Sequence, residues 1–242
     1  MEFEPSTRNE KDTTRARANI LREFLTHSNK VNRFDHKEIK EVMDLCLSCK
    51  GCKTDCPTNV NIARYKTEFL SRYYSHKPRP VMDAMIGRIG AWLPHATKLS
   101  PVLNYAMGNP LVRKAGAYFG LAREAKFPKV ASQSFRSSAT ARRILKNERV
   151  RAGTEVLLWV DSFNNGFTPN VLEAGVTVLE ALGFSVKLMK RHVCCGRPYY
   201  DVGMIDQAKS NLEQILAQLA PVLEEGLPVI VLEPSCLSVF RD

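Results

Sequence analysis

Seven cysteines carry the most specific chemistry in this sequence, and four of them lie in one short run. Cys46, Cys49, Cys52 and Cys56 are separated by two, two and three residues, and Pro57 follows at once. The spacing C-x₂-C-x₂-C-x₃-C-P is typical of bacterial 4Fe–4S ligation, because several thiolates must converge on one cube from a tight loop. The run therefore predicts iron–sulfur chemistry and one-electron transfer.

The residues between these cysteines support a cluster site. Gly51 is expected to provide the unusual backbone angles that a tight loop needs. Lys50 and Lys53 would place positive charge beside an anionic cluster and favour its reduced state. A structural zinc site is the alternative, although it usually takes two Cys-x-x-Cys pairs separated by a longer loop. The odd cysteine count and the lack of a visible signal peptide disfavour a disulfide framework.

The role of Cys56 has two interpretations. In proteins with two such clusters, the fourth cysteine of each run ligates the other cluster. By that rule Cys46, Cys49 and Cys52 hold one cube and Cys56 reaches to a second, yet no second run occurs among the 242 residues. Either all four cysteines ligate one cube, or the chain is part of something longer.

A second cysteine group lies in the C-terminal half. Cys194, Cys195 and Gly196 follow one predicted strand, and Cys236 follows another. Open α/β sheets place their sites at the carboxyl ends of parallel strands. Metal or cluster ligation by these soft donors is the sharper hypothesis, and small buried apolar side chains are the alternative.

The hydrophobic periodicity changes along the chain. It predicts helices over residues 12–26, 36–45, 62–77, 81–93 and 110–118, with a capping box of Asp35 and Glu38 and a cap at Asn59 or Asn61. Strands over 155–160, 185–189 and 228–232 then alternate with helices over 169–182 and 202–225. This order predicts an α+β fold in which an all-α module precedes an α/β parallel-sheet domain. The expected domains are residues 1–122, a basic linker over 123–153, and residues 154–242, truncated at the C-terminus.

The formal net charge of +10 concentrates in the linker, which carries Arg136, Arg142, Arg143, Lys146 and Arg149. A solvated arm or a docking face for an acidic partner or a membrane surface is expected there, and no nucleic acid, because aromatic interleaving is lacking. Residues 81–103 are apolar but are interrupted by charges, which predicts buried or interfacial helices and no transmembrane segment. Free cysteines indicate the cytoplasm, and a peripheral position at the inner membrane face stays open.

The cysteine motifs resemble a known family. The Cys-Cys-Gly motif with Cys236 is similar to the cysteine-rich CCG domain of heterodisulfide reductases and glycolate oxidase iron–sulfur subunits. "CLSCKGCKTDCPTNVNIARYKTEFL", "CCGRPYYDVGMIDQAK" and "LEPSCLSVFRD" resemble the C-terminal half of FAD-linked oxidases, the D-2-hydroxy-acid dehydrogenases. The resemblance implies a ferredoxin-like module whose iron ligands are Cys46, Cys49, Cys52 and Cys56. It also implies tentative metal ligands in the CCG domain, which are Cys194, Cys195 and Cys236.

The resemblance further implies a function for the whole polypeptide. A flavin domain would oxidise D-lactate, D-2-hydroxyglutarate or glycolate, and its electrons would pass through the clusters to a quinone or a carrier protein. FAD would bind only in the missing N-terminal part, so no catalytic residue is expected here and the chain alone is not expected to be catalytic. Departures from the family motif stand at Asp161 and Ser162 and at Val239, where the family has cysteines.

Two other functions remain open from the sequence. The first is a stand-alone iron–sulfur subunit of a heterodisulfide-reductase-like or glycerol-3-phosphate dehydrogenase complex, which would assemble with a separate flavoprotein subunit. The second is a zinc-stabilised interaction module with no redox role.

Overall fold

Two compact units make up the part of the chain that the computed structural model describes, which is residues 10, 13–30, 32–118, 127–146 and 153–241. The first unit comprises residues 1–79 and 199–205, and the second comprises residues 80–198 and 206–242, each in its described part. Residues 80–118 therefore group with the α/β unit and not with the helices of the cysteine run.

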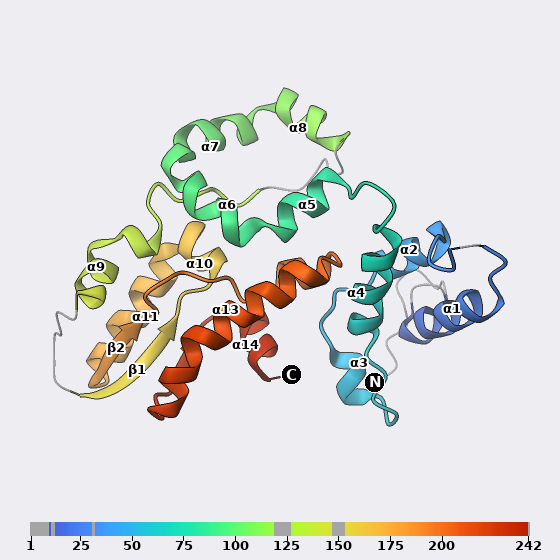
Figure 1. Ribbon diagram of the computed structural model, residues 1–242. Coiled ribbons are helices and arrows are strands. Elements are labelled where there is room, and N and C mark those ends of the chain that lie inside the picture. Colours follow the sequence, from blue (N-terminus) through green and yellow to red (C-terminus); the bar gives the residue numbers. More distant parts are fainter. Residues whose placement is uncertain (1–9, 11–12, 31, 119–126, 147–152, 242) are drawn as a thin grey trace. The chain divides into compact units, whose positions relative to one another are not determined.

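The first unit is helical, as the sequence predicts. Its helices are α1 (Thr14–His27), α2 (Lys37–Asp44), α3 (Gly51–Asp55) and α4 (Ile62–Tyr73) (Figure 1). Apolar side chains spaced at helical intervals on α1, α2 and α4 meet in one core, which includes Leu21, Ile39, Met43, Ile62 and Phe69.

Side-chain caps fix where two of these helices begin. Thr13 accepts a hydrogen bond from the backbone of Ala16 at the start of α1, and Asn61 accepts one from Arg64 at the start of α4. The expected capping box on α2 is wrong, because the N-cap residue is His36 and it makes no side-chain cap. The Asp35 carboxylate instead accepts a hydrogen bond from the ammonium group of Lys77.

The second unit begins with a run of short helices. These are α5 (Val81–Gly87), α6 (Ile89–Ala96), the 3₁₀ turn η2 (Thr97–Leu99), α7 (Ser100–Gly108) and α8 (Pro110–Ala117). The periodicity predicts α5, α6 and α8 but misses α7. Helix α6 packs closely on α10 (Ser162–Gly166), because Gly166 leaves room for the buried Leu93 side chain.

A three-stranded parallel sheet forms the centre of this unit. The strands are β1 (Thr154–Trp159), β2 (Phe184–Leu188) and β3 (Val229–Val231), in the order β2-β1-β3. The register pairs Val156 with Val186 and Leu158 with Ile230. Helices α11 (Pro169–Ala181) and α13 (Ile205–Glu224) lie between the strands in sequence, and α14 (Pro234–Arg241) follows β3. Most of the short helix α12 (Arg197–Asp201) belongs to the first unit. The predicted α+β class and parallel sheet are confirmed.

Alternation along β1 divides the core of this unit into two. Val156 and Leu158 point to one face, where α9 (Ala139–Leu145) and α11 cover the sheet. Leu157 and Trp159 point to the opposite face, where they meet apolar residues of α13 and α14 together with Cys194, Cys195 and Cys236. The second cysteine group therefore lies on one particular face of the sheet.

Much of the expected basic linker is folded. Residues 123–126 and 147–152 lie outside the described residues, but Phe135 and α9 between them belong to the core, with Ala141 and Ile144 buried. The Arg136 guanidinium donates to the carbonyls of Met189 and Lys190. Arg136 thus ties the 3₁₀ turn η3 (Phe135–Ser137) to the segment after β2, and apolar side chains hold α9 in the core, so this part of the segment is not a solvated arm.

The described helices include none that combines the length and the apolar character needed to cross a bilayer.

Shortening one buried side chain on the central strand β1 tests this core. Leu158 is 0% exposed on β1, so Leu158→Ala should lower the free energy of unfolding by about 2–5 kcal/mol. Leu182→Ala, at a side chain 68% exposed, is the control and should change it by less than about 0.5 kcal/mol. Urea unfolding followed by tryptophan fluorescence measures both, and equal effects would contradict the assignment of this core.

Candidate iron–sulfur and cysteine sites

The four-cysteine run forms one compact loop at the end of α2. The backbone N–H of Cys46 bonds the carbonyl of Met43 as the helix ends, and the short helix α3 carries Cys52 and is closed by Cys56. Ser48 and Lys50, on either side of Cys49, have left-handed backbone with φ of 54° and 61°. The expected role of Gly51 is therefore wrong, since the unusual angles fall on its neighbours. Backbone in this region is uncommon for residues with side chains and is typical of functional loops.

The four thiols lie in different surroundings. Cys46 and Cys52 are partly buried and pack against the core of the first unit, whereas Cys49 is exposed. Cys52 Sγ accepts a hydrogen bond from the backbone N–H of Ile62 at 3.3 Å. The loop thus presents an apolar side towards the core and an open side at Cys49.

Residues after Pro57 direct hydrogen-bond donors at Cys56. The pKa of its thiol is lowered because it interacts with the Thr58 hydroxyl, 3.1 Å away, and with the backbone N–H groups of Val60, Thr58 and Asn59. Asn59 has left-handed backbone with φ of 54°, and its N–H also donates to the carbonyl of Cys56 at 2.9 Å. Such concave groups of N–H donors stabilise anions, so this end of the loop favours a thiolate.

Two basic side chains that the motif analysis missed lie at the start of the loop. Lys66 Nζ donates to the carbonyl of Cys46 at 2.7 Å, and the Arg17 guanidinium donates to the carbonyl of Leu45 at 3.2 Å. Both satisfy carbonyl groups left free at the end of α2. Only the fold brings α1 and α4 to this point, so spacing alone gives no signal for either residue.

The donor set fits an iron–sulfur cluster in its chemistry. Four thiols lie on one short loop, and N–H groups point at two of the sulfurs. Among the residues that the structure describes, however, no three His, Cys, Asp or Glu side chains are gathered as a group that could hold a metal ion. The ligand assignment of Cys46, Cys49, Cys52 and Cys56 therefore stays a prediction.

The cysteines of the second group are buried, and their thiols contact one another. The Cys195 thiol contacts both Cys194 and Cys236, which arrive from the segments after β2 and β3. The Cys194 interaction lowers the pKa of Cys195, but the Cys236 thiol and burial outweigh it and raise the pKa to about 12. The pKa of Cys194 is also raised, by its hydrogen bond to Cys195 and by burial. Cys195 thus contacts both other cysteines, although the three are not gathered as a group that could hold a metal ion, and the thiols of Cys194 and Cys195 are protonated at neutral pH.

Residues around this group hold it in place. Gly196 has φ of +84°, which explains the glycine of the Cys-Cys-Gly motif, and Asn211 Nδ2 donates to the carbonyl of Cys194 at 2.6 Å. Gly90 on α6 lies so close that an added Cβ would be 2.4 Å from Cβ of Cys194. Helix α6 therefore closes one side of the cysteine group.

The positions where the family has further cysteines hold other groups. The Ser162 hydroxyl interacts with the Cys194 thiol and lies 3.2 Å from His192 Nε2. Burial and then the charge of Arg136 lower the pKa of His192 to about 4, so it is neutral. Asp161 is fully buried and caps α10 by accepting two hydrogen bonds from Asn164, and burial still raises its pKa. Val239 adds an apolar contact, so Ser162 is the only one of these three to bring a polar atom to the thiols.

Removal of the Thr58 hydroxyl tests the thiolate at Cys56. In Thr58→Val the thiol loses its strongest donor, so its pKa should rise and alkylation of Cys56 by iodoacetamide at neutral pH should slow. Mass spectrometry of the Cys56 peptide measures the alkylation rate over a range of pH. The pH at which the rate is half its maximum should be higher in Thr58→Val. Thr54→Val, at an exposed position in the same loop, is the control, and an equal shift in both variants would refute the role of Thr58.

A methyl group on α6 tests the closure of the second group. Gly90→Ala should destabilise the chain by about 1–3 kcal/mol, because the methyl overlaps Cys194, and should increase labelling of Cys194 by thiol reagents. Gly108→Ala on α7 meets no atom within 4 Å and should leave stability and labelling unchanged. Equal labelling in the two variants would show that α6 does not close the site.

Each of the two groups of cysteines lies in a region that matches a known protein family. Residues 3–61 match the family of 4Fe-4S dicluster domains, and residues 161–241 match the cysteine-rich CCG domain family. The first match contains all four loop cysteines and the second contains Cys194, Cys195 and Cys236.

D-2-hydroxyglutarate dehydrogenases match most of the chain, and lactate utilization protein A matches about a third of it. The chain is 24% identical to D-2-hydroxyglutarate dehydrogenase of Escherichia coli over 226 residues, 89% of this chain and 22% of that protein. The enzyme of the same name from Pseudomonas putida is 26% identical over 86% of this chain and 21% of its own length. Lactate utilization protein A of Bacillus velezensis is 34% identical over 36% of this chain and 35% of that protein.

The chain spans about a fifth of the length of the dehydrogenases it matches. No solved structure matches it significantly. The resemblance of the two cysteine motifs to an iron–sulfur module and a CCG domain is confirmed, and the chain contains a 4Fe-4S dicluster domain followed by a CCG cysteine-rich domain.

Proposed function

We propose that this chain is the electron-transfer portion of an FAD-linked oxidoreductase that oxidises a D-2-hydroxy acid. The observation that carries the proposal is the loop in which four thiols share one short segment and N–H groups point at the sulfurs of Cys52 and Cys56. A bound 4Fe–4S cluster supplies one-electron transfer. The chain itself supplies the thiolates, the apolar floor beneath Cys46 and Cys52, and cations beside the loop at Lys66 and Arg17.

The ligands are assigned by the two-cluster rule. Cys46, Cys49 and Cys52 hold one cube, and Cys56 ligates a second. Two cubes with four thiolates each need about eight cysteines, and the matched dicluster region has four. The remaining ligands of both cubes then come from a second run outside these 242 residues.

The substrate class rests on the relatives. The names of those relatives refer to D-2-hydroxyglutarate and to lactate, both 2-hydroxy acids. The proposed partner is a flavin domain of the same polypeptide, and the acceptor is a quinone or a carrier protein. We place this assembly in the cytoplasm, with access to the inner face of the membrane, and expect no catalysis from the chain alone.

One comparison favours a different organisation. The 88 residues matched in lactate utilization protein A are 35% of that protein, which therefore has about 250 residues, close to the length of this chain. A stand-alone iron–sulfur subunit with a separate flavoprotein is accordingly the second candidate. Flavin-domain sequence in the same reading frame would exclude it.

The buried cysteines have a secondary role in this proposal. Cys194, Cys195 and Cys236 would ligate a metal only after losing protons, and burial raises the pKa of the first two. Metal binding there would compete with protons and would strengthen as pH rises. At neutral pH their main contribution is to the core beneath Trp159.

Anaerobic reconstitution with ferrous iron and sulfide tests the relay. We expect bound iron, acid-labile sulfide and an EPR signal after dithionite reduction, all abolished in Cys49→Ser. Cys236→Ser is the control and should retain the iron of the loop. Bound zinc without iron or sulfide would defeat the relay and support the zinc-stabilised interaction module.

A second pair of variants tests the ligand assignment. Cys52→Ser should lose the cube held by this loop, whereas Cys56→Ser should retain it because its sulfur belongs to the other cluster. Equal loss of iron in both variants would show that all four cysteines ligate one cube.

A further inference from the structure

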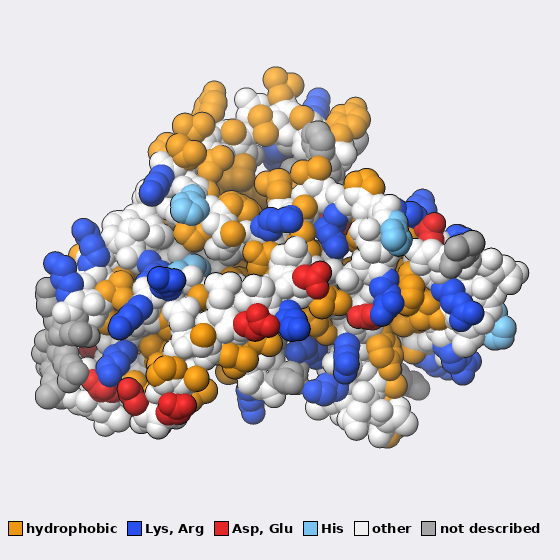
Figure 2. All heavy atoms as spheres, viewed as in Figure 1, with side chains coloured by type: hydrophobic (Ala, Val, Ile, Leu, Met, Phe, Trp, Pro, Cys, Tyr) orange, Lys and Arg blue, Asp and Glu red, His pale blue; other side chains and the backbone are white. Residues whose placement is uncertain are grey.

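An exposed apolar surface covers α7 and α8. Tyr105 is 79% exposed, Leu111 is 72% exposed and Tyr118 is 90% exposed. Figure 2 shows hydrophobic side chains gathered over these two helices. We define the α7–α8 surface by its large apolar side chains, which are Leu99, Val102, Tyr105, Leu111, Val112 and Tyr118. Contiguous apolar patches of this kind mark interaction sites on proteins.

The opposite side of α7 fixes the direction in which this surface faces. Leu103 and Met107 pack with Ile89 and Leu93 of α6. The Asn104 side chain donates to the carbonyl of Val130 at 2.8 Å and accepts from its N–H at 2.9 Å. With one side of α7 held in this way, Val102 and Tyr105 must point outward. Their exposure is therefore a consequence of the packing within this unit.

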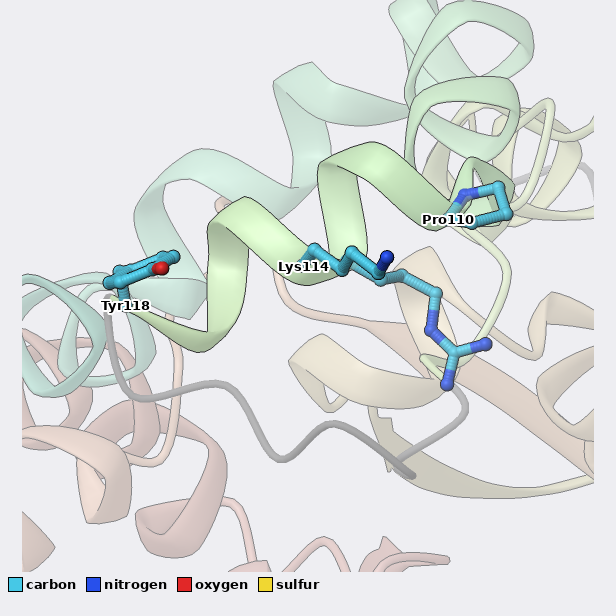
Figure 3. Close-up of a pocket in the computed structure, with 4 residues that line it drawn as sticks. Pro110, Lys114 and Tyr118 are labelled. Carbon is cyan, nitrogen blue, oxygen red and sulfur yellow. The ribbon is translucent and has the colours of Figure 1, made fainter.

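Positive charge accompanies the apolar side chains. Residues 81–118 contain four basic residues and one acid, which are Arg88, Lys98, Arg113, Lys114 and Asp83. An open pocket of about 420 Å³ on α8 is lined by Pro110, Arg113, Lys114 and Tyr118 (Figure 3). Two cations beside an aromatic ring suit the phosphate of a lipid headgroup at the border of an apolar phase.

We propose that the α7–α8 surface docks on an anionic phospholipid bilayer. Leu111, Val102 and Tyr105 enter the boundary between headgroups and acyl chains, and Lys98, Arg113 and Lys114 face the phosphates. Charge complementarity selects this occupant, because a second copy would bring an equally basic surface against the first. The inference needs neither a cluster nor electron transfer, so it can fail independently of the proposed function.

Vesicle co-sedimentation of the whole 242-residue chain tests the proposal. The chain should bind vesicles of phosphatidylglycerol and phosphatidylcholine, and bind pure phosphatidylcholine vesicles more weakly. Leu111→Ser should weaken binding by roughly tenfold or more, since a leucine side chain leaves the apolar phase. Lys98→Glu combined with Lys114→Glu should remove most of the preference for anionic vesicles, at about fivefold or more for each position.

Matched variants elsewhere in the same unit serve as controls. Leu182→Ser replaces a leucine of similar exposure, 68%, and Lys209→Glu replaces an exposed lysine on α13. Both should bind as the unchanged chain does, and circular dichroism should show that every variant is folded. The proposal is overturned if the unchanged chain stays in the supernatant with anionic vesicles, or if Leu111→Ser and Leu182→Ser weaken binding equally. A dimer that Leu111→Ser dissociates, without vesicle binding, would also overturn it and assign the surface to a second copy.

Discussion

Strand β1 is the element on which the α/β unit depends. It pairs in parallel with β2 on one edge and β3 on the other, and both of its faces are covered. A parallel strand in this position must be apolar on both faces, which is why Val156 to Trp159 read as a continuous hydrophobic run. The strict alternation of side chains then sends Leu158 towards α11 and Trp159 towards the cysteines, so the register of this one strand decides what surrounds each thiol.

The chain sets its two groups of thiols in opposite environments. At Cys56, the Thr58 hydroxyl and backbone N–H groups surround a partly exposed sulfur and lower the pKa of its thiol, which favours the thiolate. At Cys194 and Cys195, burial among apolar side chains and neighbouring thiols raises the pKa. The Cys56 thiol of the first unit is thus shifted towards the thiolate form, whereas the Cys194 and Cys195 thiols of the second unit are protonated parts of the core. This contrast supports the proposal that electron transfer belongs to the loop and that the buried group is mainly structural.

The sequence was most informative where spacing alone carries the chemistry. Cysteine spacing identified the iron–sulfur motif, the resemblance of the Cys-Cys-Gly motif to a known family identified the second domain, and apolar periodicity predicted the sheet and most helices. Predictions from the sequence were wrong where contacts between residues distant in the chain determine the local structure. The Asp35 carboxylate, which a capping box would use, accepts a hydrogen bond from Lys77 instead. Phe135, Ala141 and Ile144 are buried in the core and fold a segment that its basic residues predicted to be a linker. The left-handed angles at Ser48 and Lys50 could not be foreseen, because a glycine beside them is the residue that normally takes such angles. Lys66 and Arg17 come from distant helices, so no local pattern points to them.

Helix α6 connects the buried cysteine group of the second unit with the α7–α8 surface. Its Gly90 lies against Cys194, and from Ala96 the chain continues through η2 into α7 with no intervening loop. Small residues at both contacts, Gly90 against the thiol and Gly166 against Leu93, let the helix approach so closely that it has little freedom to move. The orientation of the α7–α8 surface is therefore coupled to the packing around the cysteines. A bilayer or any other partner that binds this surface holds the sheet and its buried thiols in a defined orientation, because no flexible connection lies between them.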